Sequence, residues 1–453
     1  MTETYDILVI GAGPAGYAAA LEAAALGRST ALVERNLLGG TCLNRGCIPT
    51  KLFLGATAPI PAIAAQSRLR LGQGSFTADM AALQKRKTSL LAATRQAMTK
   101  TLETAGIRLI SGEAELSGPT QVLVRTTDDT QTRVDFHRLI LALGSAPSWP
   151  ELLTPDGEAV LSSDHALDLS TVPVSLIVIG AGAIGLEMAQ FFQRMGSSVT
   201  LIEAAERIAP TEDPEICAQL ASMLKRQGVT VRANATVCAL ERTAEGIRVR
   251  LGAEEEVTAS KVLVAVGRKP NTHFPGLETI LPARKKNALE VDENLMLSEH
   301  IFAVGDCNGM TLLAHAAEDQ GRFAARYAAG KISGPYAPGP IPFCIYGDPE
   351  AFRVGPTLEE TRANGLSCTE SKAQLAANPV AQAAAAPHGL VKVLWHDDTV
   401  IGVSAVGHGV LHLVTTATIM VAQGWSRSQA ENLIFAHPTL DETLRHALLT
   451  TPQ

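Results

Sequence analysis

Two cysteines, Cys42 and Cys47, lie five positions apart in the run GGTCLNRGCIPTK at residues 39–51. They follow a glycine-rich turn at 11–16 and an acid, Glu34, that ends the next apolar strand. Thiols this close in sequence could form a structural crosslink, half of a metal site or a catalytic disulfide. Because they stand beside a phosphate-binding type of turn, they indicate a redox pair next to a dinucleotide.

The remaining cysteines and histidines decide among these three possibilities. No second closely spaced Cys or His pair completes a zinc site, so we expect no metal centre. The other cysteines are scattered singly, as Cys217, Cys238, Cys307, Cys344 and Cys368. This scatter disfavours the disulfide scaffold of a small secreted domain and leaves the redox role.

Helix geometry adds a constraint on the pair Cys42 and Cys47. In a helix the rise of about 1.5 Å per residue separates them by about 7.5 Å along the axis, beyond the usual span of a disulfide. We therefore expect a local distortion of any helix between them. Strain of this kind makes a bridge more reducible, which suits a disulfide that opens and closes in each turnover.

Length and composition set wider bounds. The 453 residues, 46% hydrophobic, are enough for about three domains with sizeable cores. The net charge of −7 argues against nucleic acid as a partner, because binding phosphates needs a basic face. We see no cleavable leader before the strand Ile7–Ile10 and no apolar run of the ~20 residues that a membrane helix needs. A cytoplasmic protein without a membrane partner is expected.

An internal repeat divides the chain. The run ILVIGAGPAG at 7–16 recurs as IVIGAGAIG at 177–185. Five residues of the first copy return 169 positions later: Gly11, Gly13, Gly16, Gly27 and Glu34 correspond to Gly180, Gly182, Gly185, Gly196 and Glu203. Each copy reads as strand, glycine turn, helix, strand and terminal acid. A single glycine turn could serve packing alone, but two copies in this context predict two dinucleotide-binding units.

Each residue type in the repeat has a physical reason. The first glycine allows the tight turn, the second lets the backbone approach a pyrophosphate, and the third lets helix and strand pack closely. The helix N-terminus supplies N–H donors for the phosphates. Glu34 and Glu203 would each accept hydrogen bonds from a ribose. Because Glu203 would repel a 2′-phosphate, and Ala204 and Ala205 after it supply no arginine, the second unit should prefer NAD over NADP.

Seven ordered motifs make the chain resemble the class I pyridine nucleotide–disulfide oxidoreductases, and within them the dihydrolipoamide dehydrogenases. The resemblance covers residues 5 to about 447. The motifs are GAGPAG at 11–16, GGTCLNRGCIPTK at 39–51, GAGAIGLE at 180–187, VAVGRKPNT at 264–272, IFAVGDC at 301–307, LLAHAAEDQG at 312–321 and HPTLDETL at 437–444.

The resemblance implies an α/β fold with two Rossmann-like domains, which bind FAD and NAD, and a C-terminal α+β domain that builds a homodimer. The implied boundaries are 1–147 with 270–335 for the FAD domain, 148–269 for the NAD domain and 336–453 for the interface domain. In such a dimer each disulfide would be served by a histidine of the other subunit.

The resemblance also implies which residues bind the cofactors. For FAD these are Gly11, Gly13, Gly16, Glu34, Gly40, Thr41, Lys51, Ala114, Ser145, Asp306, Ala314 and His315. For NAD they are Gly180, Gly182, Gly185, Glu203, Val237 and Gly267. By the same resemblance Lys51 lies near the flavin N5 and pairs with Glu187. Without it, both residues could be ordinary surface charges.

An acid–base pair is predicted near the C-terminus. His437 can accept a proton from an incoming thiol, since the thiolate rather than the thiol attacks a disulfide. Glu442 would bind the other ring nitrogen and fix the tautomer. An isolated His-Pro could merely begin a helix. Within HPTLDE, and with a cysteine pair upstream, the catalytic interpretation is favoured.

The implied reaction oxidises protein-bound dihydrolipoamide to lipoamide with NAD as acceptor. By resemblance Cys42 exchanges with the substrate and Cys47 faces the flavin, and the expected partner is a lipoyl-bearing protein or a 2-oxoacid dehydrogenase-type complex. Two alternatives stay open: an NADH-dependent reductase of another disulfide, and a docking subunit with vestigial redox chemistry. Glutathione reductase-like use is disfavoured by Glu203. Mercuric reductase and large thioredoxin reductase are disfavoured because 448–453 holds no cysteine pair.

Three positions depart from the usual dehydrogenase pattern. Phe435 stands where a histidine often precedes HPT, and Asp348 replaces the histidine of the usual YTHPE run, here YGDPE. Residues 407–412 lack the usual acid. All three lie in the expected interface domain. They leave the disulfide chemistry intact but put the substrate channel and any docking to a multienzyme core in question.

Overall fold

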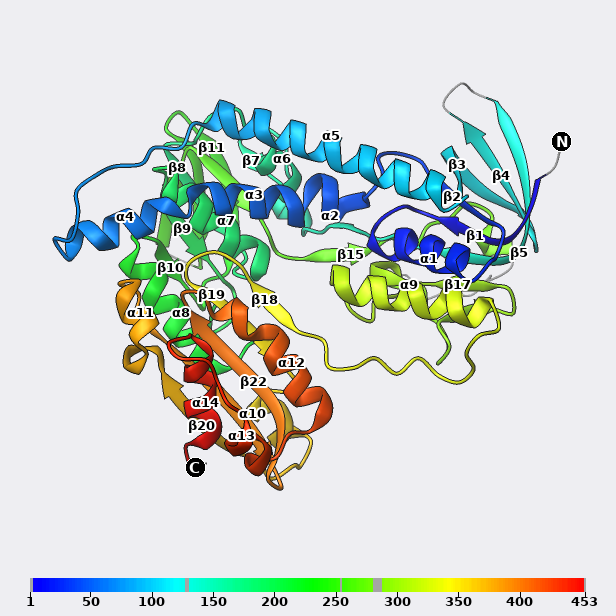
Figure 1. The fold of residues 1–453 in the computed structure, drawn as a ribbon. Coiled ribbons are helices and arrows are strands. Elements are labelled where there is room, and N and C mark those ends of the chain that lie inside the picture. The colour runs from blue at the N-terminus through cyan, green and yellow to red at the C-terminus, as the bar shows by residue number, and fades with distance from the viewer. Residues whose placement is uncertain (1–2, 127–129, 253–254, 280–286, 452–453) are drawn as a thin grey trace. The chain divides into compact units, whose positions relative to one another are not determined.

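The computed structural model describes residues 3–126, 130–252, 255–279 and 287–451 (Figure 1). The chain folds into two compact units. The first comprises Met1–Pro49, Lys85–Ser148 and Arg268–Pro338, and the second comprises Thr50–Gln84, Trp149–Gly267 and Gly339–Gln453. The predicted division into three domains, with its boundaries, stays a prediction.

The first unit is built on a seven-stranded sheet. Five strands run parallel in the order β3 (Arg108–Gly118), β2 (Thr30–Glu34), β1 (Glu3–Ile10), β5 (Gln131–Leu141) and β17 (Ile301–Ala303). Antiparallel β4 (Gln121–Thr126) joins β3 to β5, and β16 (Met296–Ser298) pairs with β17. The end of β1 is fully apolar and buried, as expected for a parallel strand covered on both faces.

Helices α1 (Pro14–Ala25) and α9 (Ala314–Ala328) pack side by side in this unit (Figure 1). Small residues let them approach, since a Cβ on Gly321 would overlap the carbonyl oxygen of Ala15. Helix α2 (Gly40–Arg45) and the 3₁₀ turn η3 (Gly305–Asn308) follow β2 and β17. The remaining elements of the first unit are η2 (Leu277–Thr279) and an antiparallel pair of strands, β6 (Ser145–Pro147) and β15 (Arg268–Pro270).

The second unit contains another parallel sheet. Its order is β10 (Thr230–Arg232), β9 (Ser198–Ile202), β8 (Ser175–Ile179), β14 (Lys261–Val264) and β7 (Val160–Leu161). An antiparallel sheet of β11 (Val237–Thr243), β12 (Gly246–Leu251) and β13 (Glu255–Ala259) accompanies it. The helical elements of these residues are η1 (Glu151–Leu153), α6 (Ser163–Leu167), α7 (Ala183–Arg194) and α8 (Pro214–Arg226). The strand–turn–helix–strand order of β1–α1–β2 recurs here as β8–α7–β9.

The C-terminal part of the second unit is an antiparallel sheet with helices. The strand order is β18 (Phe343–Ile345), β19 (Glu350–Val354), β22 (Thr399–Gly407), β21 (Gly389–His396) and β20 (Thr369–Gln374). The helical elements are α10 (Leu358–Ala363), η4 (Leu375–Ala377), α11 (Pro379–Ala383), η5 (Val410–Leu413), α12 (Val414–Gln423), α13 (Arg427–Asn432) and α14 (Asp441–Leu449). Together with the two Rossmann-like units, this α+β region confirms the predicted fold class.

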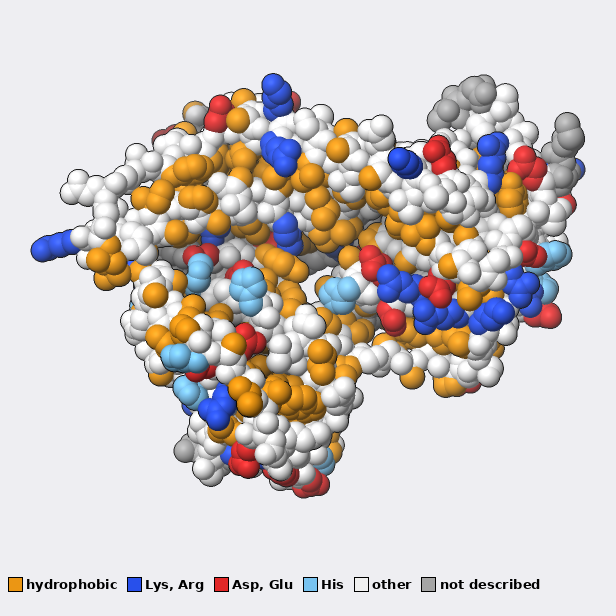
Figure 2. All heavy atoms as spheres, viewed as in Figure 1, with side chains coloured by type: hydrophobic (Ala, Val, Ile, Leu, Met, Phe, Trp, Pro, Cys, Tyr) orange, Lys and Arg blue, Asp and Glu red, His pale blue; other side chains and the backbone are white. Residues whose placement is uncertain are grey.

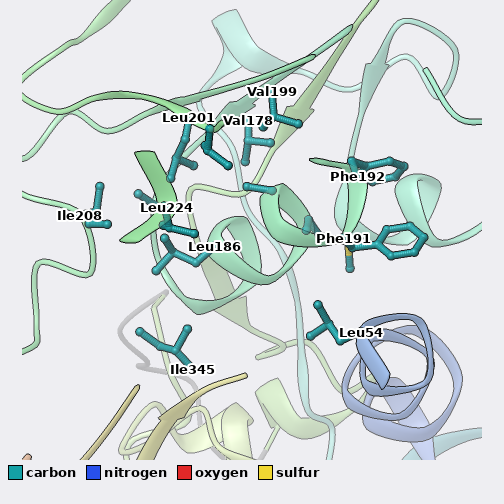
Figure 3. Packing of buried hydrophobic residues seen from close by; sticks show 14 of the residues in the cluster. Leu54, Val178, Leu186, Phe191, Phe192, Val199, Leu201, Ile208, Leu224 and Ile345 are labelled. Atoms are coloured by element: carbon teal, nitrogen blue, oxygen red, sulfur yellow. The ribbon is translucent and has the colours of Figure 1, made fainter. Parts of the chain in front are cut away.

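The core of the second unit joins its helices to the parallel sheet. The ring of Phe53 stacks on that of Phe191 with centroids 4.9 Å apart. Figure 3 shows side chains from several elements meeting around α7: Leu54, Val178, Leu186, Phe191, Phe192, Val199, Leu201, Ile208, Leu224 and Ile345. The burial of this cluster fixes α7 against β8 and β9, and therefore fixes the glycine turn that precedes α7.

Three consecutive helices form the stretch Gly40–Arg68: α2, α3 (Cys47–Thr57) and α4 (Pro59–Arg68). By length and composition this stretch is apolar enough to cross a membrane, so the expectation that no such run exists was wrong. One such stretch is weak evidence for a membrane span, because core helices of soluble proteins pass the same test; 28% of its apolar window is buried. The mixed-charge stretch 80–105 predicts one long helix, and α5 (Met80–Thr104) confirms it.

Candidate active site

The two glycine turns have the same geometry. Gly11 and Gly180 adopt φ angles of +96° and +98°, and a Cβ at either would overlap the carbonyl oxygen of Ala142 or Ala265. Only glycine satisfies both demands, since other residues rarely adopt positive φ. The predicted role of the first glycine as a turn residue is therefore confirmed in both copies.

The second and third glycines differ in what surrounds them. A Cβ on Gly16 or Gly185 would overlap the carbonyl oxygen of the first glycine of its own turn, so these positions serve close packing. A Cβ on Gly182 would meet no described atom within 4 Å, and one on Gly13 would lie 3.9 Å from the nearest. These two residues are the N-caps of α7 and α1, which no described side chain caps. The start of α7 thus faces open space at Gly182, whereas Gly13 at the start of α1 lies beside Gly40.

The strand-ending acids bind their own turns. One oxygen of Glu34 accepts a hydrogen bond of 2.7 Å from the amide of Ala12, and Glu203 does the same with Ala181 at 2.7 Å. The second oxygen of Glu203 accepts from the amide of Ala205 at 2.9 Å. Each carboxylate is therefore held in place beside the turn. Its role toward a ribose stays a prediction.

Asp306 and Ser145 are joined as neighbours in the first unit. The hydroxyl of Ser145 donates to Asp306 at 2.6 Å, and Arg268 donates to the same hydroxyl at 2.8 Å. Gln320, which is 1% exposed, accepts from the amide of Gly305 at 2.7 Å. Sequence reasoning missed Arg268 and Gln320 as supports of Asp306. Their signal was present, because they lie in the motifs VAVGRKPNT and LLAHAAEDQG.

The other predicted cofactor residues take varied places. Gly40 and Thr41 begin α2, while Ala314 and His315 are the first two residues of α9. The side chain of Ala114 lies in the hydrophobic core beside β4, so only its backbone could meet a ligand. In the second unit Val237 begins β11, and Gly267 has a φ of +132° with no described atom within 4 Å of the place that a Cβ would take.

The cysteine pair spans a break between two helices. Cys42 lies in α2, which ends at Arg45, and Cys47 is the first residue of α3. Gly46 between the helices has φ −144° and ψ −111°, outside the helical region. The expected distortion between the cysteines is therefore present. Both cysteines are half-buried.

Three of the other thiols are poorly suited to redox chemistry. Burial raises the pKa of Cys217, Cys307 and Cys344 to about 11 in each case. Since the thiolate is the reactive form, these cysteines are chemically quiet near neutral pH. Among the described residues, no group of three or more His, Cys, Asp or Glu side chains is placed to hold a metal ion.

Lys51 and Glu187, which are far apart in sequence, form an ion pair. The Lys51 Nζ lies 2.8 Å and 3.0 Å from the two carboxylate oxygens of Glu187. Glu187 is 4% exposed, and its burial raises the pKa of the carboxyl group while Lys51 opposes that rise. Lys51 lies on α3, four residues after Cys47. The predicted pairing of the two side chains is present, whereas a role for them in the reaction stays a prediction.

His437 and Glu442 are also in contact. The Nδ1 of His437 lies 3.0 Å from the nearer oxygen of Glu442, whose other oxygen accepts from the amide of Thr439 at 3.1 Å. These hydrogen bonds lower the pKa of Glu442, with that from His437 the largest cause. A carboxylate at Nδ1 favours the tautomer in which Nε2 has a lone pair, so the ring can accept a proton there. The His437 side chain is 74% exposed.

Two of the regions that depart from the usual dehydrogenase pattern, Asp348 and the segment 407–412, contact each other. The carboxylate of Asp348 lies 3.3 Å from Nδ1 of His408. Nearby, Glu350 accepts a hydrogen bond of 3.1 Å from the amide of Leu411. Phe435 packs against the C-terminal hydrophobic core.

Hydrophobic side chains are also exposed over α12 (Figure 2). Exposed residues in this part of the chain include Ile419 at 47%, Leu433 at 37% and Ile434 at 94%. An exposed apolar surface of this kind is typical of a protein–protein interface.

The sequence matches two family descriptions along most of its length. Residues 5–321 match "Pyridine nucleotide-disulphide oxidoreductase", and residues 341–448 match its "dimerisation domain". The chain therefore belongs to the pyridine nucleotide–disulphide oxidoreductase family. Within this family it is a flavoprotein disulfide oxidoreductase similar to dihydrolipoyl dehydrogenase, and its dimerisation domain supports a homodimer.

Relatives by sequence and by structure agree with this placement. Dihydrolipoyl dehydrogenase of Bacillus subtilis is 34% identical over 98% of this chain and 98% of its own, and that of Chlorobaculum tepidum is 33% identical over 98% and 96%. The crystal structure of LpdA from Mycobacterium tuberculosis matches with a TM-score of 0.90 at 26% identity, covering 98% of this chain and 99% of its own. The flavoprotein disulfide reductase RclA from Escherichia coli, induced by HOCl, matches with 0.85 at 26% identity, covering 98% and 99%.

Membership of this family implies FAD and a pyridine nucleotide. The two turns fit such groups, because each has a helix N-terminus without a side-chain cap and a second glycine at which a Cβ would meet at most an ordinary contact, at 3.9 Å for Gly13 and none within 4 Å for Gly182. A pyrophosphate could approach the backbone at Gly13 and Gly182 without a clash.

Proposed function

We propose that the chain oxidises dihydrolipoamide on a carrier protein to lipoamide, with NAD as acceptor, through a disulfide between Cys42 and Cys47. FAD would lie at the turn of Gly11–Gly16 and NAD at the turn of Gly180–Gly185. The observation that carries this proposal is the cysteine pair itself, which follows the first turn and spans a helix break. The similarity to dihydrolipoyl dehydrogenases supports the substrate class.

The preference for NAD rests on charge at the second turn. Glu203 places a carboxylate beside the position where a ribose would lie, and a 2′-phosphate there would be repelled. The next arginine along the chain, Arg207, is engaged in an ion pair with Glu359 at 2.5 Å. Arg207 is therefore not held ready for a phosphate.

The two thiols have different surroundings. Cys47 begins α3, and the positive end of a helix stabilises a thiolate at its first residue. Cys47 is thus suited to be the leaving thiolate. Cys42, by the family resemblance, receives the substrate. His437, held by Glu442, would act on the cysteine pair of the partner subunit, which agrees with its high exposure.

Thiol–disulfide exchange between the substrate and the cysteine pair takes two steps. His437 takes a proton from one substrate thiol, the thiolate attacks Sγ of Cys42, and the bond between Cys42 and Cys47 breaks to release Cys47 as a thiolate. The second substrate thiol then attacks the substrate sulfur of the mixed disulfide, the bond to Sγ of Cys42 breaks, and the leaving Cys42 thiolate takes the proton of that thiol as the oxidised lipoyl ring closes. The substrate has then lost two electrons and two protons, and the cysteine pair holds both electrons. FAD and NAD, when bound, supply the acceptor chemistry that restores the disulfide.

A second candidate is an NADH-dependent reductase of another disulfide. The contact between Asp348 and His408 favours it, because both residues lie where the chain departs from the usual dehydrogenase pattern, in the region expected to form the substrate channel. The similarity to a flavoprotein disulfide reductase from Escherichia coli also supports it. A docking subunit with vestigial chemistry would instead show a flavin spectrum that NADH leaves unchanged. We place the protein in the cytoplasm, as a proposal from its sequence.

The test is anaerobic reduction of NAD by free dihydrolipoamide with the purified flavoprotein. The wild type should turn over, Cys47→Ser should retain flavin but lose turnover, and Cys238→Ser should behave as wild type because Cys238 is exposed and lies outside the pair. Absent turnover with a flavin that NADH reduces would favour the reductase. Normal turnover in Cys47→Ser would refute the disulfide assignment.

A further inference from the structure

Helix α7 carries three buried polar side chains on one face. Glu187, Gln190 and Arg194 are 4%, 1% and 8% exposed. Their spacing of three and four residues places them above one another along the helix. Buried polar groups are costly unless they find hydrogen-bonding partners, so the partners of this row are informative.

All three side chains bind the short segment Tyr346–Asp348, which follows β18. Glu187 accepts from the amide of Tyr346 at 3.2 Å, and Gln190 accepts from the amide of Asp348 at 2.8 Å. Arg194 donates to the carbonyl oxygen of Asp348 at 3.0 Å. Between them, Gly347 has a φ of +133°, and a Cβ there would overlap the Gln190 amide. The backbone of the segment is therefore fixed on α7.

This clamped backbone places the Tyr346 ring against Lys51. The Nζ of Lys51 lies 4.1 Å from the ring centroid, within the range of a cation–π contact. The same nitrogen bonds both oxygens of Glu187. The ammonium thus has two anchors, a carboxylate and an aromatic face, on a side chain that is 32% exposed.

We propose that Tyr346 is a positioning residue for Lys51, whose ring confines the ammonium to the orientation in which Glu187 also binds it. A lysine has a flexible four-carbon stem, so one ion pair with a carboxylate leaves its charge free to swing toward solvent. The ring closes that path. The inference rests on the proposed function, in which Lys51 lies beside the flavin, and it adds the residue that holds Lys51 there.

Two substitutions separate the ring from the backbone. Tyr346→Leu removes the aromatic face, Tyr346→Phe keeps it, and both keep the amide that Glu187 accepts from. Phe343→Leu is the matched control, because Phe343 lies on β18, three residues before Tyr346, but its ring faces Arg353, with the guanidinium carbon 4.8 Å from the centroid. Tyr346 is 38% exposed, so its truncation opens no closed cavity. Tyr346→Gln provides a second variant without a ring.

The first measurement is the rate of reductive methylation of Lys51 in the purified full-length flavoprotein, followed by peptide mass spectrometry. Tyr346→Leu and Tyr346→Gln should label roughly two- to fivefold faster than wild type, as expected from the loss of one cation–π contact. Tyr346→Phe and Phe343→Leu should label at the wild-type rate. Equal labelling of wild type and both ring-less variants would overturn the positioning role.

The second measurement separates this inference from the proposed function. The protein reduced by two electrons should show a long-wavelength absorbance from a thiolate beside oxidised flavin, and its intensity should fall in Tyr346→Leu and recover in Tyr346→Phe. Faster labelling together with unchanged absorbance would support the role of Tyr346 toward Lys51 and contradict the placement of Lys51 beside the flavin. Slow labelling with lowered absorbance would contradict the role of Tyr346.

Discussion

Replacing either of two glycines in the second turn by alanine should have opposite consequences. Gly182→Ala adds a methyl group where no described atom lies within 4 Å, and Gly185→Ala adds the same group 1.9 Å from the carbonyl oxygen of Gly180. The distance of 1.9 Å is far below 3.0 Å, and Cβ atoms in protein structures essentially never lie closer than 3.0 Å to another heavy atom. The backbone must therefore move by about 1 Å or more at Gly185, and no movement is needed at Gly182.

The expected magnitudes follow from these contacts. Overpacking against backbone costs about 1–3 kcal/mol or more, so Gly185→Ala should lower the urea midpoint of the second unit clearly. At Gly182 the φ of −74° suits alanine. Alanine restricts the unfolded chain more than glycine does, which stabilises the fold slightly, but it is a slightly poorer N-cap residue. These two small effects offset each other, so the free energy of unfolding should change by no more than about 0.5 kcal/mol. A pyrophosphate would meet the new methyl group, and loss of one or two charged hydrogen bonds weakens NADH binding by about tenfold or more.

Two assays distinguish the variants. Tryptophan fluorescence reports unfolding of the second unit, because Trp149, Trp395 and Trp425 all belong to it. Calorimetry of NADH binding reports the nucleotide site. Wild-type NADH affinity in a stable Gly182→Ala protein would refute the assignment of the open space to a pyrophosphate. Wild-type stability of Gly185→Ala would refute the packing argument.

Three further perturbations test the electrostatics. Pairing with Asp348 raises the pKa of His408, so the stabilisation from this pair is complete below pH 6.5 and is lost as the pH rises through the folded-state pKa. The free energies of unfolding of wild type and His408→Gln should differ by about 1 kcal/mol or less at pH 6 and converge by pH 9. A difference that does not change with pH would contradict this. Glu203→Gln should raise the kcat/KM ratio of NADPH to NADH by about tenfold, because it removes one repelling charge; an unchanged ratio would count against charge as the basis of the preference. Lys392→Met should destabilise the second unit by about 3 kcal/mol, measured by urea unfolding, since the Lys392 side chain is 8% exposed and bonds Asp213 at 2.8 Å. A loss under 1 kcal/mol would contradict this.

Much of the fold could be predicted from local patterns. The glycine turns required specific backbone angles and close contacts at Gly11, Gly16 and their repeats, and the structure has them. The long helix over 80–105 also follows from its residue pattern. This helix and the contacts of Gly16 and Gly185 within their own turns depend on residues near in sequence, which is why a single sequence reveals them. The contacts of Gly11 with Ala142 and of Gly180 with Ala265 join residues far apart in sequence.

The contacts that shape the candidate site are of a different kind. Lys51 meets Glu187 across 136 positions, and only the family resemblance joined them beforehand. The polar row on α7 and the segment at Tyr346 were not anticipated, because no local pattern says which loop will satisfy a buried glutamine or arginine. At Asp348 the sequence indicated a missing histidine, but only the fold revealed that Asp348 pairs with His408.

The central claim, that Cys42 and Cys47 form the redox-active disulfide, is tested most directly by counting thiols. The oxidised flavoprotein would be treated anaerobically with one equivalent of dihydrolipoamide, alkylated and digested, and each cysteine quantified by mass spectrometry. We predict that Cys42 and Cys47 become alkylated together, by one equivalent per chain each, while Cys217 and Cys307 do not change. Reduction of the flavin without new alkylation at this pair would contradict the account.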